Sequence, residues 1–463
     1  MKPKKLMSTL AVTSSLLMII AGCSSGSSPN SQAPSNSTNT TATTETKPAV
    51  ETINMLYWPG PESEAMSKVI ASYNNGQGQQ DGVKVNMLPA PREGFWEKQS
   101  AMMASDSTDV DIYFTASYKI GEHKNDLVTL DDKIGSDLSF FIKTSLDSLA
   151  SEGKVYGVPM DVGMHFLYYR KDLVDTLLSN PDWQSKYKEI SKQVIGKELV
   201  PKKPEEWNWD DFTAVAAFFT KKLNPESPTE YGTALQAKNL IYNVMIWNDV
   251  LYSFGGSWYT SDGKANFDTE ETRKALAVYS TLYQKGLTPA SATTFEYPET
   301  NQAFQTEKAA LILQWSAAYH ELSDQTKSPK VFDKVGIAPI PGDKHATHVH
   351  SLAVGINKHS KKQEASLKWL KYLSTKEAMT AYAENGGVPP AQEILNGLKE
   401  KRPEFPYIAE HVDKYGFVED TSENVFPILE ILAKNFSAVW AGQTDSESAV
   451  VKAQQEVTER LAK

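Results

Sequence analysis

Short apolar strands alternate with amphipathic helices along this chain, and the alternation limits it to an α/β fold. The run INMLYW (53–58) is followed by a Pro-Gly-Pro turn and a helix from Ser63. The runs VKVNML (83–88) and VDIYFTA (110–116) repeat the strand pattern, with a helical segment between them. This order predicts a mainly parallel sheet covered on both faces by helices.

The residues that directly follow the strands are the first place to look for a binding site. Ligands of open α/β sheets bind beyond the carboxyl ends of the strands. Two segments take that place in this sequence, 58–62 and 115–118.

Chain length and cysteine content indicate two lobes without disulfides. The sequence has 463 residues, 40% of them hydrophobic, and one cysteine. A single hydrophobic core stops growing near about 250–300 residues, so a body of this size predicts two lobes. One cysteine excludes an internal disulfide and a CxxC pair.

The N-terminus has the pattern of an export signal. Three lysines precede an apolar run, Leu6–Ala21, which is short for a membrane span. The run ends at Ala21-Gly22-Cys23, which resembles the bacterial lipobox, where the cysteine is acylated after residues 1–22 are removed. An uncleaved signal anchor is the alternative. Removal of the three lysines changes the formal charge from −10 to −13, which argues against a nucleic-acid partner.

A polar tether is expected after the cysteine. Residues 24–50 are rich in Ser, Thr, Asn and Pro and contain almost no large apolar side chain. Such a segment cannot bury enough surface to offset its ordering entropy, so it is expected to be flexible. A tether of this length favours a Gram-positive cell surface over a periplasm.

Three helix starts have the pattern of a capping box. In each one a side chain at the N-cap accepts from the backbone at position N3, and an acid at N3 reaches back. The pairs of N-cap and N3 residues are Asn208 with Asp211, Asp268 with Glu271, and Ser374 with Glu377.

The segment GKVYGVPMDVGMHFLYYRKDLV (153–174) resembles the signature of the family 1 extracellular solute-binding proteins of ABC importers, the group that includes maltose-binding protein. Further segments follow in the family's order over about 53–463. They are PEEWNWDDF, FGGSWYTSDGKANFDTEETRKALAVYSTLYQKGL, FQTEKAALILQWSAAY, VGIAPIPG, SLAVGIN, LKWLKYLSTKEAMTAYAENGGVPPAQ and AVWAGQTDSESAVVKAQQEVTERL. The segment ASDSTDVD departs from the family's usual A-x-G-x-x-P-D.

The resemblance implies two α/β lobes of the periplasmic-binding-protein type II fold, joined by hinge strands, with the ligand trapped when they close. It places the hinges near 159–163, 350–355 and 387–391. The N-terminal lobe would hold 51–160 and 354–388, and the C-terminal lobe 161–353 and 389–463.

The resemblance also suggests which side chains bind the ligand. A sugar offers C–H faces to aromatic rings and hydroxyl edges to carboxylates and amides. Trp315 matches the family's stacking tryptophan, Glu62 its hydroxyl-binding acid, and Asp161 lies at the hinge edge of the cleft. The other candidates are Trp58, Thr115, Ser117, Tyr118, Asn243, Trp247, Trp258, His350 and Ser351. Trp96, Trp209 and Trp369 lie in helical patterns and are expected in the core.

Metal and catalytic interpretations are weaker. The histidines of HATHVH (345–350) would bind zinc only if a loop brought them together, and we expect them in a mobile loop instead. The paired acids of a glycosidase are conceivable in Glu62 and Asp161, but these would lie on opposite sides of a cleft that opens and shuts. We expect no enzyme, no cofactor and no metal.

These observations predict a monomeric, lipid-anchored receptor that captures a carbohydrate outside the cell and passes it to an ABC permease. The aromatic residues favour an oligosaccharide weakly. The alternatives are a polyol or a sugar phosphate as the ligand, or a lipoprotein whose bound form is sensed by a membrane kinase.

Overall fold

The computed structural model describes residues 50–418 and 420–463, which belong to one compact unit. The predicted signal, Cys23 and nearly all of the tether lie outside the described residues. None of the helices formed by the described residues is long and apolar enough to cross a bilayer.

The first sheet carries the strands that the sequence predicted. Its order is β2-β1-β3-β12-β6. The strands β1 and β2 run parallel, as do β1 and β3, whereas β12 is antiparallel to both of its neighbours. The bounds are β1 Glu51–Tyr57, β2 Val83–Pro89, β3 Ile112–Ala116, β6 Val158–Gly163 and β12 His350–Ile356.

The second sheet has the order β10-β7-β9-β8, with β8 and β9 parallel and the other pairs antiparallel. A mainly parallel arrangement is therefore found only in the first half of the first sheet. The bounds are β7 His165–Arg170, β8 Tyr231–Thr233, β9 Ala309–Trp315 and β10 Val335–Ala338. Two short strand pairs complete the set: β4 Ala150–Ser151 with β5 Lys154–Val155, and β11 Thr347–His348 with β13 Gly416–Phe417.

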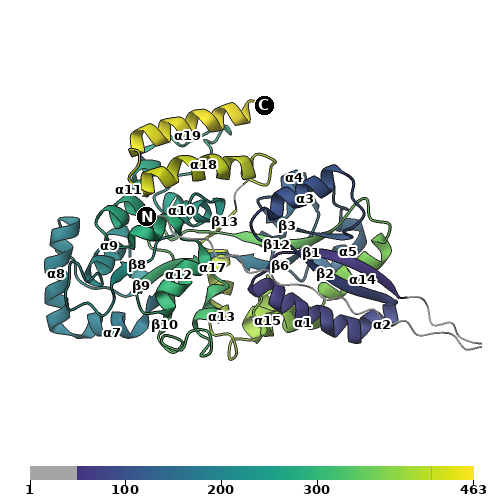
Figure 1. Ribbon diagram of the computed structural model, residues 1–463, viewed down its shortest axis with the longest axis horizontal. Helices are drawn as coiled ribbons and strands as arrows, with labels where there is room; N and C mark the ends of the chain where they lie inside the picture. The colour runs from purple at the N-terminus through teal and green to yellow at the C-terminus, as the bar shows by residue number, and fades with distance from the viewer. Residues whose placement is uncertain (1–49, 419) are drawn as a thin grey trace, which may run out of the picture. The chain divides into compact units, whose positions relative to one another are not determined.

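Helices cover both faces of the first sheet. Figure 1 shows α1, α2, α14 and α15 on one side of it and α3 and α4 on the other. The bounds are α1 Pro61–Asn75, α2 Gln77–Asp81, α3 Phe95–Ala104, α4 Ile120–His123, α5 Asp131–Leu138, α6 Lys143–Ser148, α14 Gln363–Leu373 and α15 Lys376–Glu384.

The remaining helices follow the strands of the second sheet or form the C-terminal part of the chain. They are α7 Lys171–Ser179, α8 Pro181–Ile195, α9 Trp209–Phe218, α10 Ile241–Ser253, α11 Glu270–Gln284, α12 Tyr297–Gln305, α13 Ala318–Leu322, α16 Gln392–Gly397, α17 Phe405–Lys414, α18 Val425–Trp440 and α19 Ser446–Leu461. Two short 3-10 turns are η1 Pro204–Glu206 and η2 Ala290–Thr294.

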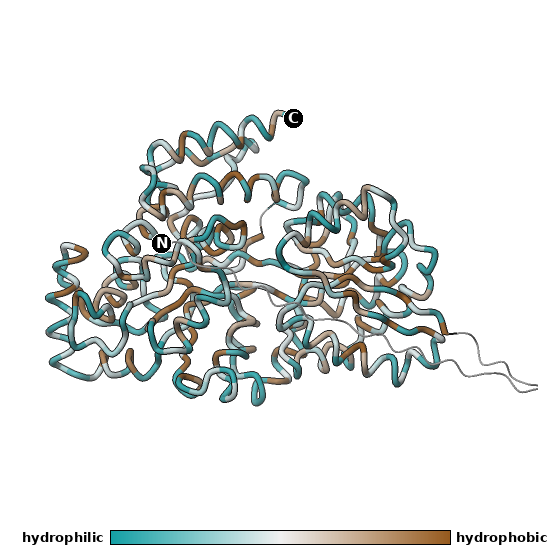
Figure 2. The backbone as a smooth tube through the Cα atoms, in the orientation of Figure 1, coloured by the Kyte–Doolittle hydropathy of each residue, from teal (hydrophilic) through white to brown (hydrophobic). Residues whose placement is uncertain are grey.

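Hydrophobic residues gather along the strands, while the outer helices alternate between hydrophobic and hydrophilic positions (Figure 2). Every residue of β3, β6, β7 and β12 is buried. Continuous burial is typical of strands covered on both faces. These buried strands therefore support the residues that follow them.

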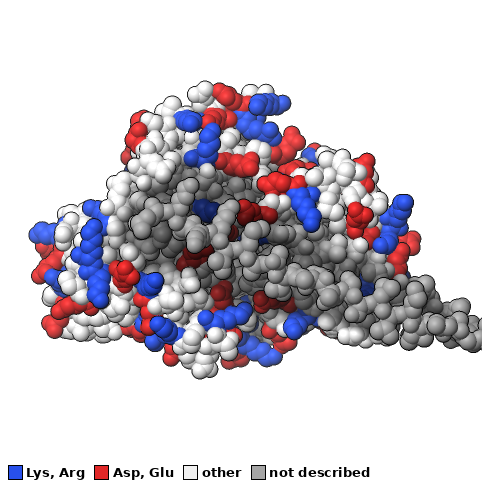
Figure 3. Space-filling model, viewed as in Figure 1, with Lys and Arg blue, Asp and Glu red and all other residues white. Residues whose placement is uncertain are grey.

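Charged side chains of both signs are interspersed on the face shown in Figure 3. The net charge of the whole chain is −10. Neither observation favours the basic surface that nucleic-acid binding requires.

Candidate functional site

One enclosed cavity lies where the carboxyl ends of β1, β3 and β9 meet β6 and β12. Its volume is about 40 Å³. About 10–15 Å³ of such space already holds one water, so the cavity has room for a few water molecules. Its lining residues are Trp58, Pro61, Glu62, Arg92, Tyr118, Asp161, Gly163, Tyr242, Tyr297, Trp315, Ser316, Ala317, His350 and Leu352.

An aromatic cluster holds Trp58 at the end of β1. Its ring lies 4.5 Å from Phe114, 5.5 Å from Trp96 and 5.6 Å from Phe95, between ring centroids. Only 2% of Trp58 is exposed, and its indole N–H has no hydrogen-bond partner among the described residues. Such ring contacts hold the indole of Trp58, which lines the cavity, in one orientation.

The guanidinium of Arg92 covers the cavity from the segment after β2. It lies 4.8 Å from the Trp58 ring and 5.3 Å from the Tyr242 ring. Its Nε is 3.9 Å from the Glu296 carboxylate. Burial opposes its charge, but Glu62, Tyr242 and Glu296 outweigh that effect and raise the pKa of Arg92 above its ordinary value. The residue is therefore a fixed cation at this wall.

Asp161 on β6 is an acid held in place by two donors. Its Oδ2 accepts from the backbone N–H of Val388 (2.8 Å) and from the hydroxyl of Tyr382 (3.1 Å). Burial, and next the Glu62 carboxylate, raise the pKa of Asp161 well above its ordinary value. A raised pKa favours the neutral form of a carboxyl, which both donates and accepts hydrogen bonds.

Three histidines pack together beside the cavity. The His348 and His350 rings lie 3.8 Å apart, and His165 lies 5.6 Å from His350, between centroids. His165 Nδ1 is 2.8 Å from Asp249 Oδ2. Burial lowers the pKa of His165 to about 3, holds those of His348 and His350 well below their ordinary value, and raises that of Asp249. The cluster is therefore uncharged at neutral pH.

The histidines of HATHVH do not converge on a zinc site. His345 contacts the carbonyls of Ile340 (2.7 Å) and Glu205 (3.1 Å) instead. His348 and His350 are buried in β11 and β12, so the expected mobile loop is wrong for them. They are buried because apolar strands flank them in the chain.

Among the described residues, one group of three side chains could hold a metal ion. It consists of Asp106, Asp126 and His359. His359 Nε2 lies 3.2 Å from the Asp106 carboxylate. None of the three lines the cavity.

Half of the twelve ligand-binding candidates line this one cavity. The six are Trp58, Glu62, Tyr118, Asp161, Trp315 and His350. Trp315 ends β9 as predicted and is partly exposed. A Cβ at Gly163 would lie 3.2 Å from its ring, so the absence of a side chain at 163 lets the tryptophan approach β6.

Three polar candidates near the first sheet lie outside the cavity lining. The Thr115 hydroxyl bonds to Nδ1 of His123 (2.9 Å). The Ser351 hydroxyl bonds to two serine hydroxyls of α6, at 2.6 and 2.8 Å. Ser117 is buried, and its N–H donates to the carbonyl of Ser351 (2.9 Å). These side chains join strands to neighbouring helices or strands.

The three candidates around α10 also lie outside the lining. Trp247 is fully buried with its ring 4.7 Å from Phe436. The Trp258 indole donates to Asn248 (3.0 Å), and the Asn243 amide donates to two backbone carbonyls. Both tryptophans therefore pack in the core of the second sheet's lobe.

Sequence reasoning missed several lining residues. Arg92 follows β2 as Trp58 follows β1, so the strand-end rule applied to 90–92 would have found it. Tyr242 and Tyr297 begin helices, and no local pattern shows which helix end faces a cleft. The other lining residues that were not named as candidates are Gly163, Ser316, Ala317 and Leu352, while Pro61 lies in the expected segment 58–62.

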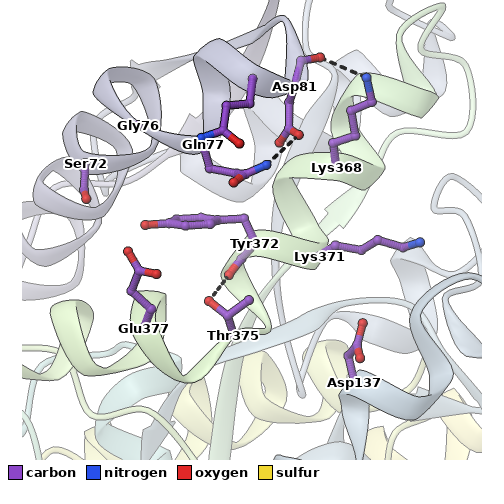
Figure 4. A pocket seen from close by; sticks show the side chains of 11 residues that line it. Ser72, Gly76, Gln77, Asp81, Asp137, Lys368, Lys371, Tyr372, Thr375 and Glu377 are labelled. Carbon is purple, nitrogen blue, oxygen red and sulfur yellow. Dashed lines mark hydrogen bonds between the residues drawn. The ribbon is translucent and has the colours of Figure 1, made fainter.

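A larger hollow lies on the surface between α1, α2, α14 and α15 (Figure 4). Its volume is about 650 Å³. Its polar side chains already bind one another: Lys368 Nζ donates to the Asp81 carbonyl (2.9 Å) and Gln77 to the Asp81 carboxylate (3.0 Å). Because these groups are paired and the hollow is open to water, it lacks the features of a built site.

Two α/β sheets whose strand ends meet around an enclosed, aromatic-lined cavity define a two-lobe binding protein. Residues 68–402 match the family described as bacterial extracellular solute-binding protein. The chain belongs to this family, whose members are binding proteins and not enzymes. The resemblance noted in the sequence is thereby confirmed.

Curated relatives carry more specific names. A mannitol-binding protein of Pseudomonas aeruginosa is 26% identical over 340 residues, which cover 68% of this chain and 71% of that protein. A protein of Brucella abortus described as a binding protein is 25% identical over 254 residues, 54% of each chain. The chain thus spans about half the length of this relative.

Solved structures share the fold. Maltose-bound MalE3 of T. maritima superposes with a TM-score of 0.75 at 23% identity, covering 88% of this chain and 99% of that one. A solute-binding protein of Agrobacterium vitis S4 with bound D-mannitol gives 0.72 at 21% identity, covering 89% and 98%. These likenesses confirm the two-lobe α/β fold.

Proposed function

We propose that this protein captures a sugar or polyol outside the cell and delivers it to an ABC permease. The observation that carries the proposal is the cavity itself, where aromatic rings adjoin buried polar atoms without partners. Such atoms are Trp58 Nε1, Glu62 Oε2, Arg92 Nε and both ring nitrogens of His350, which bond to no described residue. An unpaired buried polar group costs about 1–3 kcal/mol, so the hydroxyls of a ligand are the natural partners.

The proposed contacts are the six predicted residues that line the cavity. Trp315 offers a partly exposed ring to the C–H face of a sugar, and Glu62 and Asp161 offer carboxyl groups to hydroxyl edges. Names of relatives support this chemistry, since one is a mannitol-binding and another a lactose-binding protein.

The mechanism we propose is capture by closure. The cavity of about 40 Å³ is too small to admit a sugar, so the cleft opens before a ligand enters. A ligand that contacts both walls then shifts the equilibrium toward a closed state that encloses it, with a wider cavity than the ligand-free one, by its differential affinity for that state. The lobe boundaries given above, 51–160 with 354–388 and 161–353 with 389–463, belong to this proposal.

We also propose that Cys23 carries the lipid anchor and that the tether holds the receptor at the extracellular face, near its permease. One acyl chain binds a membrane only marginally, whereas a diacylated cysteine anchors stably. The protein would act as a monomer on a Gram-positive surface. Sensing by a membrane kinase is the second candidate, and neighbouring genes for permeases or for a kinase separate the two.

A thermal-shift panel of sugars and polyols tests the proposal. We expect at least one of them to raise the melting temperature, and Trp315→Ala to abolish that shift while the ligand-free melting temperature changes little. Trp183→Ala is the matched control, because Trp183 of α8 packs on Phe218 (5.3 Å) away from the cavity lining and should leave the shift intact. Stabilisation by a non-sugar solute alone would overturn the ligand class.

A further inference from the structure

We propose that Arg92 determines specificity, and that the site selects a small, uncharged solute with adjacent hydroxyls, one sugar ring or an open-chain polyol. This inference rests on the proposed function. It decides among the ligands that the sequence left open, because it excludes oligosaccharides and sugar phosphates.

The position of Arg92 gives it contacts to both walls of the cavity. Its guanidinium packs on Trp58, from the first sheet, and on Tyr242, from α10, at 4.8 and 5.3 Å. Side-chain exposure is 32% for Arg92, while its Nε is buried without a hydrogen bond to any described residue. A planar fork that is stacked on rings is pre-organised, so little entropy is lost when it binds two hydroxyl oxygens.

The charges around Arg92 disfavour an anionic solute. The carboxylates of Glu62 and Glu296 both act on the guanidinium, and Glu296 Oε1 is 3.9 Å from its Nε. Two carboxylates against one guanidinium leave this wall with net negative charge. A phosphate or carboxylate brought into the cavity would face that charge at short range and low dielectric, where repulsion is strong.

The contacts around the cavity limit the length of the solute. On one side the Trp96 indole donates to the Tyr242 hydroxyl (3.3 Å), beside Arg92. Another cross-cleft contact is the ion pair of Glu64 on α1 with Lys327, 3.6 Å apart. A chain of several sugars would have to break such contacts for the closed state to form.

The tryptophans offer no extended surface for several sugar rings either. Trp58 is 2% exposed, and Trp247 and Trp258 are fully buried away from the cavity. The partly exposed rings of the lining are Trp315, Tyr242 and Tyr297, and they border a cavity of only about 40 Å³. Rings that border so small a space, together with closely spaced polar atoms, match one sugar ring or one polyol, whose hydroxyls both donate and accept.

Isothermal titration calorimetry on the full chain tests the inference. The ligands are D-mannitol, ribitol, D-glucose, maltotriose and glucose 6-phosphate. We expect a neutral small solute to bind, and maltotriose and glucose 6-phosphate to bind at least tenfold more weakly. Arg92→Ala should lower the affinity for the solute about tenfold or more, the loss expected for hydrogen bonds to a charged group. Arg92→Lys keeps the charge without the planar fork and should also lower the affinity.

The control is Arg273→Ala, which removes an arginine that bonds Glu447 on the surface, at 2.6 Å, and should leave affinity unchanged. Glu296→Gln removes a negative charge beside Arg92, so it should reduce the difference in affinity between glucose and glucose 6-phosphate. Equal or tighter binding of maltotriose or glucose 6-phosphate overturns the inference while the proposed function survives. Wild-type affinity in both Arg92 variants also overturns it. If no carbohydrate or polyol of any length binds, the proposed function itself fails.

Discussion

Among single residues, Asp161 links the site to the fold. The same carboxyl that lines the cavity accepts hydrogen bonds from Val388, in the segment that leads to α16, and from Tyr382 on α15. Because burial and the Glu62 carboxylate raise its pKa well above the ordinary value, folding favours the neutral acid over the carboxylate. An amide is the closest mimic of a neutral carboxyl.

Asp161→Ala and Asp161→Asn should therefore differ in stability. The alanine leaves the Val388 N–H and the Tyr382 hydroxyl without their acceptor, at about 1–3 kcal/mol for each buried group. The asparagine keeps an acceptor oxygen in the same place, so we expect it to lose less than half as much. Urea unfolding at pH 7 measures both, and equal losses would show that the two hydrogen bonds contribute little.

Buried histidines make stability depend on pH. Burial lowers the pKa of His123 to about 3, and Lys119 adds to the shift. The unfolded chain titrates near about 6.5, so between these values the unfolded state binds more protons and acid favours unfolding. The raised pKa of Asp161 acts in the opposite sense, because its neutral form is favoured as the pH falls.

A variant isolates the histidine contribution. His123→Asn retains a polar atom near Nδ1 that can bond the Thr115 hydroxyl, but it does not titrate. We expect the wild type to lose about 1.4 kcal/mol per pH unit relative to this variant between pH 6 and 4. Chemical unfolding at a series of pH values gives both curves. Parallel curves would mean that His123 carries a proton in the folded protein.

At the scale of elements, the sequence predicted helix starts well and placed two of the caps one residue early. Asn208 forms the expected capping box with Asp211 at the start of α9. At α11 the N-cap is Thr269, not Asp268, because the Thr269 hydroxyl accepts from the Thr272 N–H (3.2 Å) while Asp268 binds Arg273. The N-cap of α15 is likewise Thr375, and not Ser374.

The cap of α11 gives a direct comparison between neighbours. Thr269→Ala removes the cap and should cost about 1 kcal/mol of stability. Asp268→Ala removes one arm of a partly exposed ion pair and should cost about half of that or less. Thermal unfolding of the two variants ranks them. The reverse order would make Asp268 the residue that stabilises the helix start.

The candidate site was predictable where a strand carries it. Trp58, Tyr118 and Trp315 follow or end strands, and the alternation of apolar strands and helices fixes where strands end. Tyr242 and Tyr297 were not predictable, because long-range packing decides which helix ends reach the cavity. Trp247 was a candidate for ligand contact, but it lies on a buried helix and packs in the core.

At the scale of the whole molecule, two neighbouring strands connect the halves of the site. In the first sheet β6 pairs with β12, with Asp161 opposite Leu352, and β7 of the second sheet begins two residues after β6 ends. Both β6 and β12 also line the cavity. A change in the angle between the sheets therefore acts on the cavity directly, which is the geometry of hinge closure.

Locking the closed state should trap or exclude the ligand. Glu64 and Lys327, which the proposed boundaries place on different lobes, form an ion pair of 3.6 Å, and both side chains are exposed. With Cys23 replaced by Ser, Glu64→Cys and Lys327→Cys provide two thiols for a short bis-maleimide. Protein bridged without ligand should no longer take it up, because the closed cavity of about 40 Å³ has no room for entry. Protein bridged with ligand bound should release the ligand far more slowly.

The Glu64→Cys single variant is the control, and after the same treatment it should bind and release the ligand normally. Unchanged uptake by the bridged protein would exclude opening at this edge as the route of entry.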